Sequence, residues 1–385
     1  MTSQYLGIDE SELSRRRALW TAREIEQQPR VWRRTQEILR GNATGIDAFL
    51  KPLLAQNDLR VILTGAGSSA YIGQCLAPEL LRVLTRRVEA IATTDLVSGP
   101  RDYFQPQVPT LLVSFGRSGN SPESIAAVQA AATLVERCHQ LIITCNADGE
   151  LYRRCADDPN SLAILLPEET HDRSFAMTSS FSSMLLAGHL ALSAQIAGEL
   201  VAPMAAGGAR VLSQYGPVMK ALAAQNHARV VFLGSKGLQG LANEAALKLM
   251  ELTDGAVVTR ADSPLGFRHG PKTVINADTL VFVFLSNDPL TRRYDLDLVQ
   301  ELRSDARARR VLTIGTQPDV DANDGGQFVL PELARAGDTD LMPAFVMIAQ
   351  LYAFHRALQL GNAPDSPSAS GTVNRVVQGV TIHSF

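Results

Sequence analysis

The sequence contains few cysteines and carries no surplus of basic charge. Its 385 residues include four cysteines, at positions 75, 138, 145 and 155, and they form no CxxC pair. A chain of this length does not need disulfides for stability, so we expect reduced thiols. The 36 Lys and Arg residues against 39 Asp and Glu give a net charge of −3. This balance indicates neither a nucleic-acid nor a membrane partner.

Apolar runs of the kind used for targeting are also missing. The first residues include Glu10, Glu12 and the run Arg15–Arg17, and they contain no apolar h-region of a signal peptide. No uninterrupted apolar run approaches the length that spans a membrane. We therefore expect a cytoplasmic protein.

A glycine- and serine-rich loop is the most informative feature that is present. The apolar segment 111–113 runs into Ser-Phe-Gly-Arg-Ser-Gly-Asn-Ser (114–121), followed by Pro122 and Glu123 at the start of an expected helix. Free N–H groups and hydroxyls at a helix start favour an anion. The loop lacks the lysine of a GxxxxGK[ST] motif, which favours a small phosphomonoester over a nucleoside triphosphate. The alternative is a capped turn without a ligand.

The chain repeats itself at a constant offset. Segments starting at Arg60, Thr110 and Leu141 return as segments starting at Arg229, Thr279 and Arg310 (229 − 60, 279 − 110 and 310 − 141 all equal 169). Three strand-like segments in one register indicate two copies of one domain. We expect an N-terminal helical segment over 1–45, domains over 46–206 and 207–360, and a tail over 361–385 docked on the active site. The pair Gly207-Gly208 marks the expected junction.

Each copy alternates short apolar strands with helices. In the first copy we expect helices over 69–85, 121–138 and 179–200, and an N-terminal helix over 12–39. Continuously apolar strands separated by helices predict an α/β fold with a parallel sheet covered on both faces. Ligands bind beyond the carboxyl ends of such strands, where the 65–69 and 114–121 loops fall.

The second copy keeps the strands but changes the loops. Its Phe284-Leu-Ser-Asn-Asp288 segment lacks the Ser-Gly-x-Ser arrangement, so we expect one phosphate site for the two copies. A helix over 240–252 instead places Glu244, Lys248 and Glu251 on one face. A loop rich in Gly and Pro follows around His269. The alternatives are a solvated salt-bridged face and a structural loop histidine.

These motifs resemble the sugar isomerase (SIS) domain of phosphosugar enzymes, present twice. The resemblance rests on Gly65-Ala-Gly-Ser-Ser69, Ser118-Gly-Asn-Ser121, Glu244 to Glu251 and His269-Gly-Pro271, and it covers nearly the whole chain. It implies two tandem flavodoxin-like αβα domains. The implied activity is the deamination and isomerisation of an amino-sugar 6-phosphate, with galactosamine 6-phosphate converted to tagatose 6-phosphate and ammonia. No cofactor and no metal are implied.

The resemblance also implies roles for individual residues. Glu251 would move a proton between C1 and C2, Lys248 would lie at the reacting end, and His269 would open the sugar ring. In a related synthase this histidine comes from the partner subunit, which implies a homodimer. Gln378 stands where that synthase has a Schiff-base lysine, which puts the covalent step in doubt. The residues implied to bind phosphate and substrate are Gly67, Ser68, Ser69, Arg117, Ser118, Asn120, Ser121, Thr178, Ser179 and Glu244.

Other functions remain open on the sequence alone. Gly65-Ala-Gly-Ser-Ser-Ala70 with Glu89 fits a dinucleotide-binding oxidoreductase, although the second loop and the repeat argue against it. A non-catalytic sugar-phosphate sensor would usually carry a DNA-binding module, for which no length is spare. Aldose–ketose isomerisation without deamination, and deamination of glucosamine 6-phosphate, would use the same proton shuttle. Both alternatives therefore stay open. The run 168–172 could pass for a metal cluster, but we expect it to face solvent.

Overall fold

The structure, a computed structural model, describes residues 3–155, 158–319, 326–377 and 379–384. The chain forms two compact units from segments that alternate along the sequence. The first-copy unit comprises Val31–Asp172, Ser179–Gly198 and Val373–Phe385, and the second-copy unit comprises Met1–Arg30, Arg173–Thr178 and Glu199–Thr372. The domains expected from the sequence are consecutive blocks, whereas each compact unit combines separate stretches of chain.

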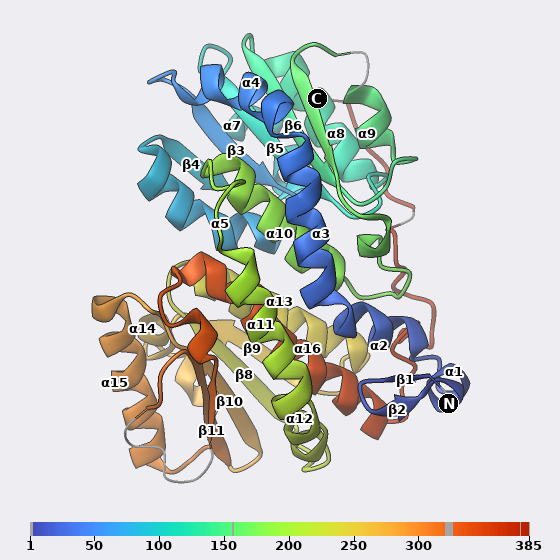
Figure 1. Ribbon diagram of the computed structural model, residues 1–385, viewed down its shortest axis with the longest axis vertical. Coiled ribbons are helices and arrows are strands. Elements are labelled where there is room, and N and C mark those ends of the chain that lie inside the picture. The colour runs from blue at the N-terminus through green and yellow to red at the C-terminus, as the bar shows by residue number, and fades with distance from the viewer. Residues whose placement is uncertain (1–2, 156–157, 320–325, 378, 385) are drawn as a thin grey trace. The chain divides into compact units, whose positions relative to one another are not determined.

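The first-copy unit contains a five-stranded sheet of order β4-β3-β5-β6-β7, in which all the strand pairs are parallel (Figure 1). Its strands are β3 (Arg60–Thr64), β4 (Arg87–Ala90), β5 (Thr110–Gly116), β6 (Cys138–Thr144) and β7 (Ser161–Leu165). Its helices are α4 (Ala43–Leu54), α5 (Ser68–Leu84), α6 (Thr93–Ser98), α7 (Pro100–Tyr103), α8 (Pro122–Leu134), α9 (Glu150–Cys155), the 3-10 turn η1 (Glu168–Thr170) and α10 (Ser179–Leu192). The helix α3 (Gln28–Gly41) continues into this unit from residue 31.

Helices cover both faces of this sheet. On one face Ile62 and Leu112 pack with Leu96 of α6 and with the alanines of α8. On the other face Phe115 lies against Gly188 of α10, where an added Cβ would come within 2.9 Å of the ring. The central strands β3 and β5 are almost wholly buried because helices cover both faces of the sheet.

The second-copy unit repeats this architecture with the order β12-β11-β10-β8-β9, again parallel. Its strands are β8 (Arg229–Gly234), β9 (Val258–Asp262), β10 (Thr279–Phe284), β11 (Arg310–Gly315) and β12 (Gln327–Val329), with a β1 (Gln4–Tyr5) and β2 (Ile8–Asp9) hairpin. Its helices are α1 (Glu10–Arg15), α2 (Leu19–Glu26), α11 (Val201–Arg210), the π-helix η2 (Val211–Tyr215), α12 (Gly216–Ala223), α13 (Gly237–Leu252), α14 (Pro264–Phe267), η3 (Pro271–Val274), α15 (Pro289–Asp305), η4 (Pro331–Leu333) and α16 (Asp338–Gln359). The predicted α/β fold with two helix-flanked parallel sheets is confirmed.

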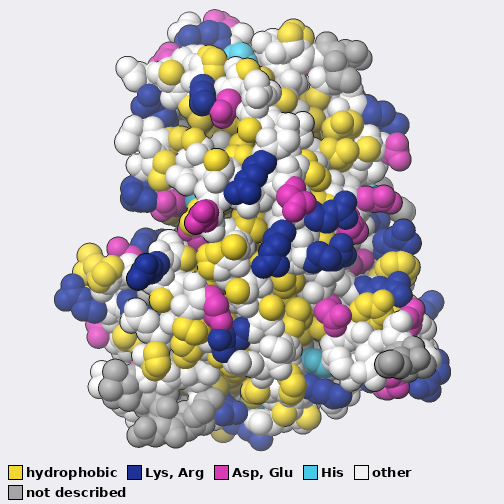
Figure 2. Space-filling model, in the orientation of Figure 1, with side chains coloured by type: hydrophobic (Ala, Val, Ile, Leu, Met, Phe, Trp, Pro, Cys, Tyr) yellow, Lys and Arg dark blue, Asp and Glu magenta, His cyan; other side chains and the backbone are white. Residues whose placement is uncertain are grey.

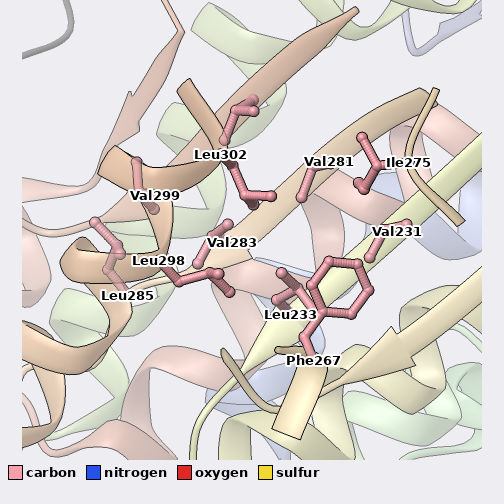
Figure 3. Packing of buried hydrophobic residues seen from close by; sticks show 11 residues of the cluster. Val231, Leu233, Phe267, Ile275, Val281, Val283, Leu285, Leu298, Val299 and Leu302 are labelled. Atoms are coloured by element: carbon pink, nitrogen blue, oxygen red, sulfur yellow. The ribbon is translucent and has the colours of Figure 1, made fainter. Parts of the chain in front are cut away.

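Different side chains fill the two faces of the second sheet. Val231, Leu233, Val281 and Val283 point toward Leu298 and its neighbours on α15 (Figure 3). On the opposite face, Phe282 and Phe284 of β10 contact aromatic side chains of α16, with the Phe284 and Phe345 rings stacked at a centroid distance of 6.2 Å. Helices of the same unit therefore cover both faces of the second sheet.

Several predicted helix boundaries were wrong. The 121–138 helix ends at Leu134 because Val135 is extended and residues 138–144 join the sheet. The 179–200 helix ends at Leu192, where the left-handed φ of 57° at Ala194 stops it. The 12–39 helix is divided among α1, α2 and α3, and Arg17 with φ 51° lies at the first break.

The glycine pair expected at the junction of the copies lies inside α11 instead. Gly207 and Gly208 are both buried. An added Cβ on Gly207 would lie 3.2 Å from Leu333, so the glycine lets α11 pack closely against η4. Close packing of helices, rather than a chain turn, explains Gly207.

By length and composition α16 is long and apolar enough to cross a membrane, yet its most apolar stretch is wholly buried inside the fold, as in a core helix. Lys and Arg side chains are mixed with Asp and Glu on the face displayed in Figure 2. All four cysteines are free, and burial raises the pKa of the Cys145 thiol to about 12.

Asp365 ties the Pro- and Ser-rich segment to the start of α2. Its carboxylate accepts hydrogen bonds from the N–H of Trp20 (3.1 Å) and from the N–H and hydroxyl of Thr21 (2.8 and 2.7 Å). A Pro- and Ser-rich composition usually gives a flexible linker, but this carboxylate anchors the segment to the helix.

The substitution Asp365→Ala should lower the free energy of unfolding by about 1–3 kcal/mol, because three donors at a helix start lose their acceptor. Urea denaturation of the full chain measures the change. The control Asp297→Ala removes an exposed carboxylate from α15 and should leave stability within about 0.5 kcal/mol. Equal midpoints for the two variants would contradict the anchoring role.

Candidate functional site

The loop expected to bind phosphate connects the central strand of the first sheet to a helix. The strand β5 ends at Gly116, α8 begins at Pro122, and Gly119 between them has a φ of 65°. Ser121 is the N-cap of α8, and its hydroxyl accepts a hydrogen bond from the N–H of Ser124 at 3.2 Å. The first N–H groups of a 13-residue helix lack intrahelical acceptors, so this position suits an anion.

The neighbouring loop, residues 145–149 between β6 and α9, holds the 117–121 loop in place. The Asn146 side-chain amide donates to the Ser118 carbonyl at 2.8 Å, and the Glu150 N–H donates to the Asn120 side-chain oxygen at 2.8 Å. Gly149 permits this approach, because an added Cβ would lie 2.6 Å from the Ser118 carbonyl oxygen. The Asn120 side-chain oxygen is therefore engaged in bracing the loop.

The second glycine loop follows β3, the strand beside β5. Gly67 has a φ of 56°, and α5 begins directly after it with Ser68 and Ser69, both buried. An added Cβ on Gly65 would lie 2.5 Å from the Ser69 side chain, so the strand end and the helix start touch. Neighbouring parallel strands thus bring both loops to the same edge of the sheet.

Arg117 is buried at the start of the phosphate loop. Its guanidinium donates to the carbonyl of Arg375 in the C-terminal tail at 2.8 Å, and Arg375 in turn donates to the carbonyl of Asp172 at 3.1 Å. The tail is thus connected to the phosphate loop within the first-copy unit through Arg375. Gln378 lies outside the described residues. The apolar tail residues Val373 and Val377 are exposed.

Asp172 caps the helix α10 from inside the unit. Its carboxylate is buried and accepts hydrogen bonds from the Ser179 hydroxyl and from the N–H and hydroxyl of Ser180 (2.8 and 2.6 Å). The expectation that the 168–172 run faces solvent was wrong for Asp172, because the start of α10 needs an acceptor. Thr178 is also buried, in a segment assigned to the second-copy unit.

In the second copy, a carboxylate of the chain itself lies at the equivalent strand end. Asp338 accepts hydrogen bonds from the Ser286 hydroxyl (2.7 Å) and the Asn287 N–H (2.8 Å), and its carboxylate lies 3.2 Å from the Lys236 ammonium. These donors follow β10, as the phosphate loop follows β5. Asp338 thus accepts hydrogen bonds from donors of this loop within the chain, and the single phosphate site stays a prediction.

The three charged residues of α13 are largely buried. The side chains of Glu244 and Lys248 are 0% and 1% exposed, whereas that of Glu251 is 23% exposed. The Lys248 ammonium lies 3.5 Å from Glu244 and is hydrogen-bonded to Glu251. This geometry excludes the alternative of a solvated salt-bridged face, because an exposed face would leave all three in water.

His269 lies in an exposed turn after α14. Its N–H donates to the Gly266 carbonyl at 2.9 Å, and its side chain is exposed. Ion pairs fix the turn on both sides, since Arg268 pairs with Glu301 (2.8 Å) and Lys272 pairs with Asp305. The imidazole is thus presented outward from a rigid turn, unlike the buried ammonium of Lys248.

Among residues 3–155, 158–319, 326–377 and 379–384, no three His, Cys, Asp or Glu side chains are grouped closely enough to hold a metal ion.

Comparisons with known proteins agree with this geometry. A family profile described as "SIS domain" matches residues 53–194, which contain the first sheet. The D-galactosamine-6-phosphate deaminase AgaS of Escherichia coli is 47% identical over 369 residues, covering 95% of this chain and 96% of that protein. A solved structure of the tagatose-6-phosphate ketose/aldose isomerase from Escherichia coli is 42% identical with a TM-score of 0.88, covering 95% of this chain and 97% of that one. A solved structure from Clostridium novyi NT is 40% identical with a TM-score of 0.96 and covers 100% of both chains.

The chain belongs to the AgaS family. The resemblance to SIS-domain phosphosugar enzymes that the motifs predict is therefore confirmed. The individual site residues stay predictions. Within the first-copy unit the two glycine loops lie at one sheet edge, and within the second-copy unit the three charged residues of α13 contact one another.

Sequence reasoning missed the residues that support the 117–121 loop. Asn146, Gly149 and Asp172 lie in loops far from the motif in sequence, and no local spacing connects them to it. The parallel order β5-β6-β7 was the available signal, because the loops after adjacent parallel strands must meet. Arg375 carried no such signal, since it follows an irregular segment.

The substitution Gly149→Ala should raise the KM for a sugar phosphate about 10-fold, because the new methyl group would displace the Ser118 carbonyl and with it the 117–121 loop. Steady-state kinetics measures the change. The matched control is Gly45→Ala in α4, where an added Cβ meets nothing within 4 Å. Unchanged KM in Gly149→Ala would show that the 145–149 loop does not set the position of the phosphate loop.

Proposed function

We propose that the protein is an enzyme that deaminates D-galactosamine 6-phosphate to D-tagatose 6-phosphate and ammonia. The observation that carries the proposal is 47% identity over 95% of the chain to a D-galactosamine-6-phosphate deaminase. The anion-competent loop at the carboxyl end of β5 and the buried charge cluster of α13 both suit this chemistry.

The phosphate group binds at the edge of the first sheet. The α8 N-terminus and the hydroxyls of Ser118 and Ser121 supply donors, and Arg117 supplies a buried positive charge. The 67–69 loop adds Ser68 and Ser69 from the neighbouring strand. Binding the phosphate, which does not react, supplies affinity that can orient the sugar for reaction. Thr178 and Ser179 complete the predicted set.

Glu251 is the proposed general base. It is the only member of the α13 cluster that keeps appreciable contact with solvent, so a substrate can reach it, while Lys248 holds it by a hydrogen bond. The ammonium is placed to stabilise the negative charge that develops on the sugar O1. Glu244 lies 3.5 Å from the buried Lys248 ammonium on its other side.

The reaction proceeds through the open-chain sugar. His269 transfers a proton to the ring oxygen as the C1–O5 bond breaks and the O1 hydroxyl gives up its proton, a general-acid role that an imidazole can fill. Glu251 removes the C2 proton and returns it to C1, while O1 gains a proton and the amine nitrogen loses one, which converts the 2-amino aldose into a ketimine at C2 with a hydroxyl at C1. Water adds to the ketimine carbon and ammonia leaves, giving the ketose. This route uses no metal or cofactor.

A homodimer in the cytoplasm is part of the proposal. His269 is exposed on a turn fixed by ion pairs, a geometry that allows it to complete the active site of a partner subunit. The described chain supplies the rest of the proposed machinery.

Aldose–ketose isomerisation of tagatose 6-phosphate without loss of nitrogen is the second candidate. A structural neighbour at TM-score 0.88 bears that name. Both reactions use the same transfer of a proton between C1 and C2, so the two differ only in whether the group at C2 is nitrogen or oxygen.

Ammonia release from galactosamine 6-phosphate by the purified protein tests the proposal directly. We expect ammonia and a ketose phosphate in equal amounts, with slower turnover of glucosamine 6-phosphate. Galactosamine without phosphate is the control and should react far more slowly, because the anion site would be empty. Conversion of tagatose 6-phosphate to an aldose with no ammonia from any amino sugar would replace the deaminase by the isomerase.

The substitution Glu251→Gln should reduce kcat at least about 100-fold with little change in substrate affinity, because it removes the proton carrier and keeps the shape. Steady-state kinetics and substrate binding to the inactive variant measure the two effects. Glu199→Gln, at an exposed position in the same unit, is the matched control. Near wild-type kcat in Glu251→Gln would remove this residue from the mechanism.

A further inference from the structure

Two hydroxyl groups stand at core positions of the first sheet, just below the phosphate loop. Side chains alternate along a strand, so Thr64 lies on the same face as Ile62, and Ser114 lies on the same face as Leu112. Ile62 and Leu112 belong to the apolar cluster under α6 and α8. Thr64 and Ser114 are register partners on β3 and β5, and they continue this cluster toward the carboxyl ends of the strands.

The covering helices add two more hydroxyls at the same level. Thr93 precedes the core residue Leu96 by three positions on α6, and Ser124 precedes the core residue Ala127 by three positions on α8, so each pair shares a helical face. The N–H of Thr93 donates to the Gly65 carbonyl at 2.9 Å, one residue beyond Thr64. A hydroxyl layer of Thr64, Thr93, Ser114 and Ser124 thus lies between the apolar core and the loops.

Three members of the hydroxyl layer have no hydrogen-bond partner in the described part of the chain. The oxygens of Thr64, Thr93 and Ser114 are enclosed, and each residue is at least 98% buried. A buried hydroxyl without a partner costs about 1–3 kcal/mol. Packing alone gives no reason for three such groups in one layer.

The second copy shows what packing alone selects at these positions. Leu233 and Val283 are register partners on β8 and β10, and they stand 169 residues after Thr64 and Ser114. Both are buried, and Figure 3 shows their side chains within the apolar cluster of the second sheet. The copy whose loop donors are already paired with Asp338 therefore has apolar residues here, and the copy with the open loop has hydroxyls.

The fourth hydroxyl connects the layer to the phosphate loop. Ser124 receives a hydrogen bond from the Ser121 hydroxyl at 2.7 Å, and its N–H donates to the same oxygen. Ser121 is the N-cap of α8 and one of the proposed phosphate-binding residues. The layer is thus in direct contact with the anion site through one shared hydroxyl pair.

We propose that Thr64, Thr93 and Ser114 are positioning residues of the phosphate site, and that their hydroxyls gain hydrogen bonds when a phosphate group binds. The inference rests on the proposed function in placing a phosphate at the 117–121 loop. Phosphate oxygens, or the water that they carry, supply the acceptors that these donors lack in the free protein. The free protein then bears the desolvation cost, and binding relieves it.

Binding of inorganic phosphate by the full chain, measured by titration calorimetry, tests this proposal in Thr64→Val and Ser114→Ala. Each variant should bind phosphate about 10-fold more weakly or worse, since a hydrogen bond to a charged group is lost. Their urea midpoints without phosphate should stay equal or rise, because an unpaired buried hydroxyl is removed. With a sugar phosphate, KM should rise while kcat changes less than twofold.

Two controls separate positioning from packing. Thr64→Ser keeps the hydroxyl and should keep wild-type phosphate affinity. Thr110→Val removes a buried hydroxyl that donates to the Val108 carbonyl at the other end of β5, and it should lower stability without changing phosphate affinity. Phosphate affinity within twofold of wild type in both Thr64→Val and Ser114→Ala would overturn the proposal.

The phosphate titration also keeps this inference distinct from the proposed deaminase activity. Weakened phosphate binding in the variants of a protein that releases no ammonia would uphold the hydroxyl layer and reject the deaminase. Unchanged binding in variants of an active deaminase would do the reverse.

Discussion

The ammonium of Lys248 is buried on a helix between two carboxylates, and the proposed chemistry depends on that burial. An ammonium removed from water must be paired, or it loses its proton or destabilises the fold. Glu244, fully buried, supplies one partner, and Glu251, partly exposed, supplies the other. The same desolvation that makes the pairing obligatory leaves a single carboxylate of the cluster open to substrate. One face of α13 thus holds both the buried Lys248 ammonium and the partly exposed Glu251 carboxylate.

The need to pair buried polar groups also explains the loops around the sheet edges. The Asp172 carboxylate accepts a hydrogen bond from the start of α10, and the Asp338 carboxylate accepts one from the loop after β10. In each case a carboxylate outside the helix or loop satisfies donors that it leaves open, from eight residues away for Asp172 and from 51 residues away for Asp338. The loop after β5 differs, because its helix start is capped only by Ser121 from the loop itself. Donors without an internal anion are what an external phosphate requires.

The sequence predicted the layers and the repeat because both depend on local periodicity and spacing. It also placed Glu244, Lys248 and Glu251 on one face, since helical spacing is local. It did not predict that this face is buried, because burial depends on packing against α16 and the second sheet. Nor did it predict the backbone of Lys236, whose φ of 54° and ψ of −127° match those of Gly67 in the first copy. A lysine gives no sequence signal for a conformation that costs a non-glycine residue roughly 1–3 kcal/mol.

The two copies show how one fold can separate binding from packing. Both sheets have the same parallel order around the central strand, so differences at matched positions report a difference in task rather than in topology. Where the first copy has Gly67, the second copy has Lys236, whose ammonium pairs with Asp338. Where the second copy has the apolar residues Leu233 and Val283, the first copy has the hydroxyls of Thr64 and Ser114. The second copy has gained internal pairs and apolar packing at its sheet edge, whereas the first copy retains unpaired donors there. A ligand-binding edge must be less completely satisfied than a structural one, and this chain contains an example of each.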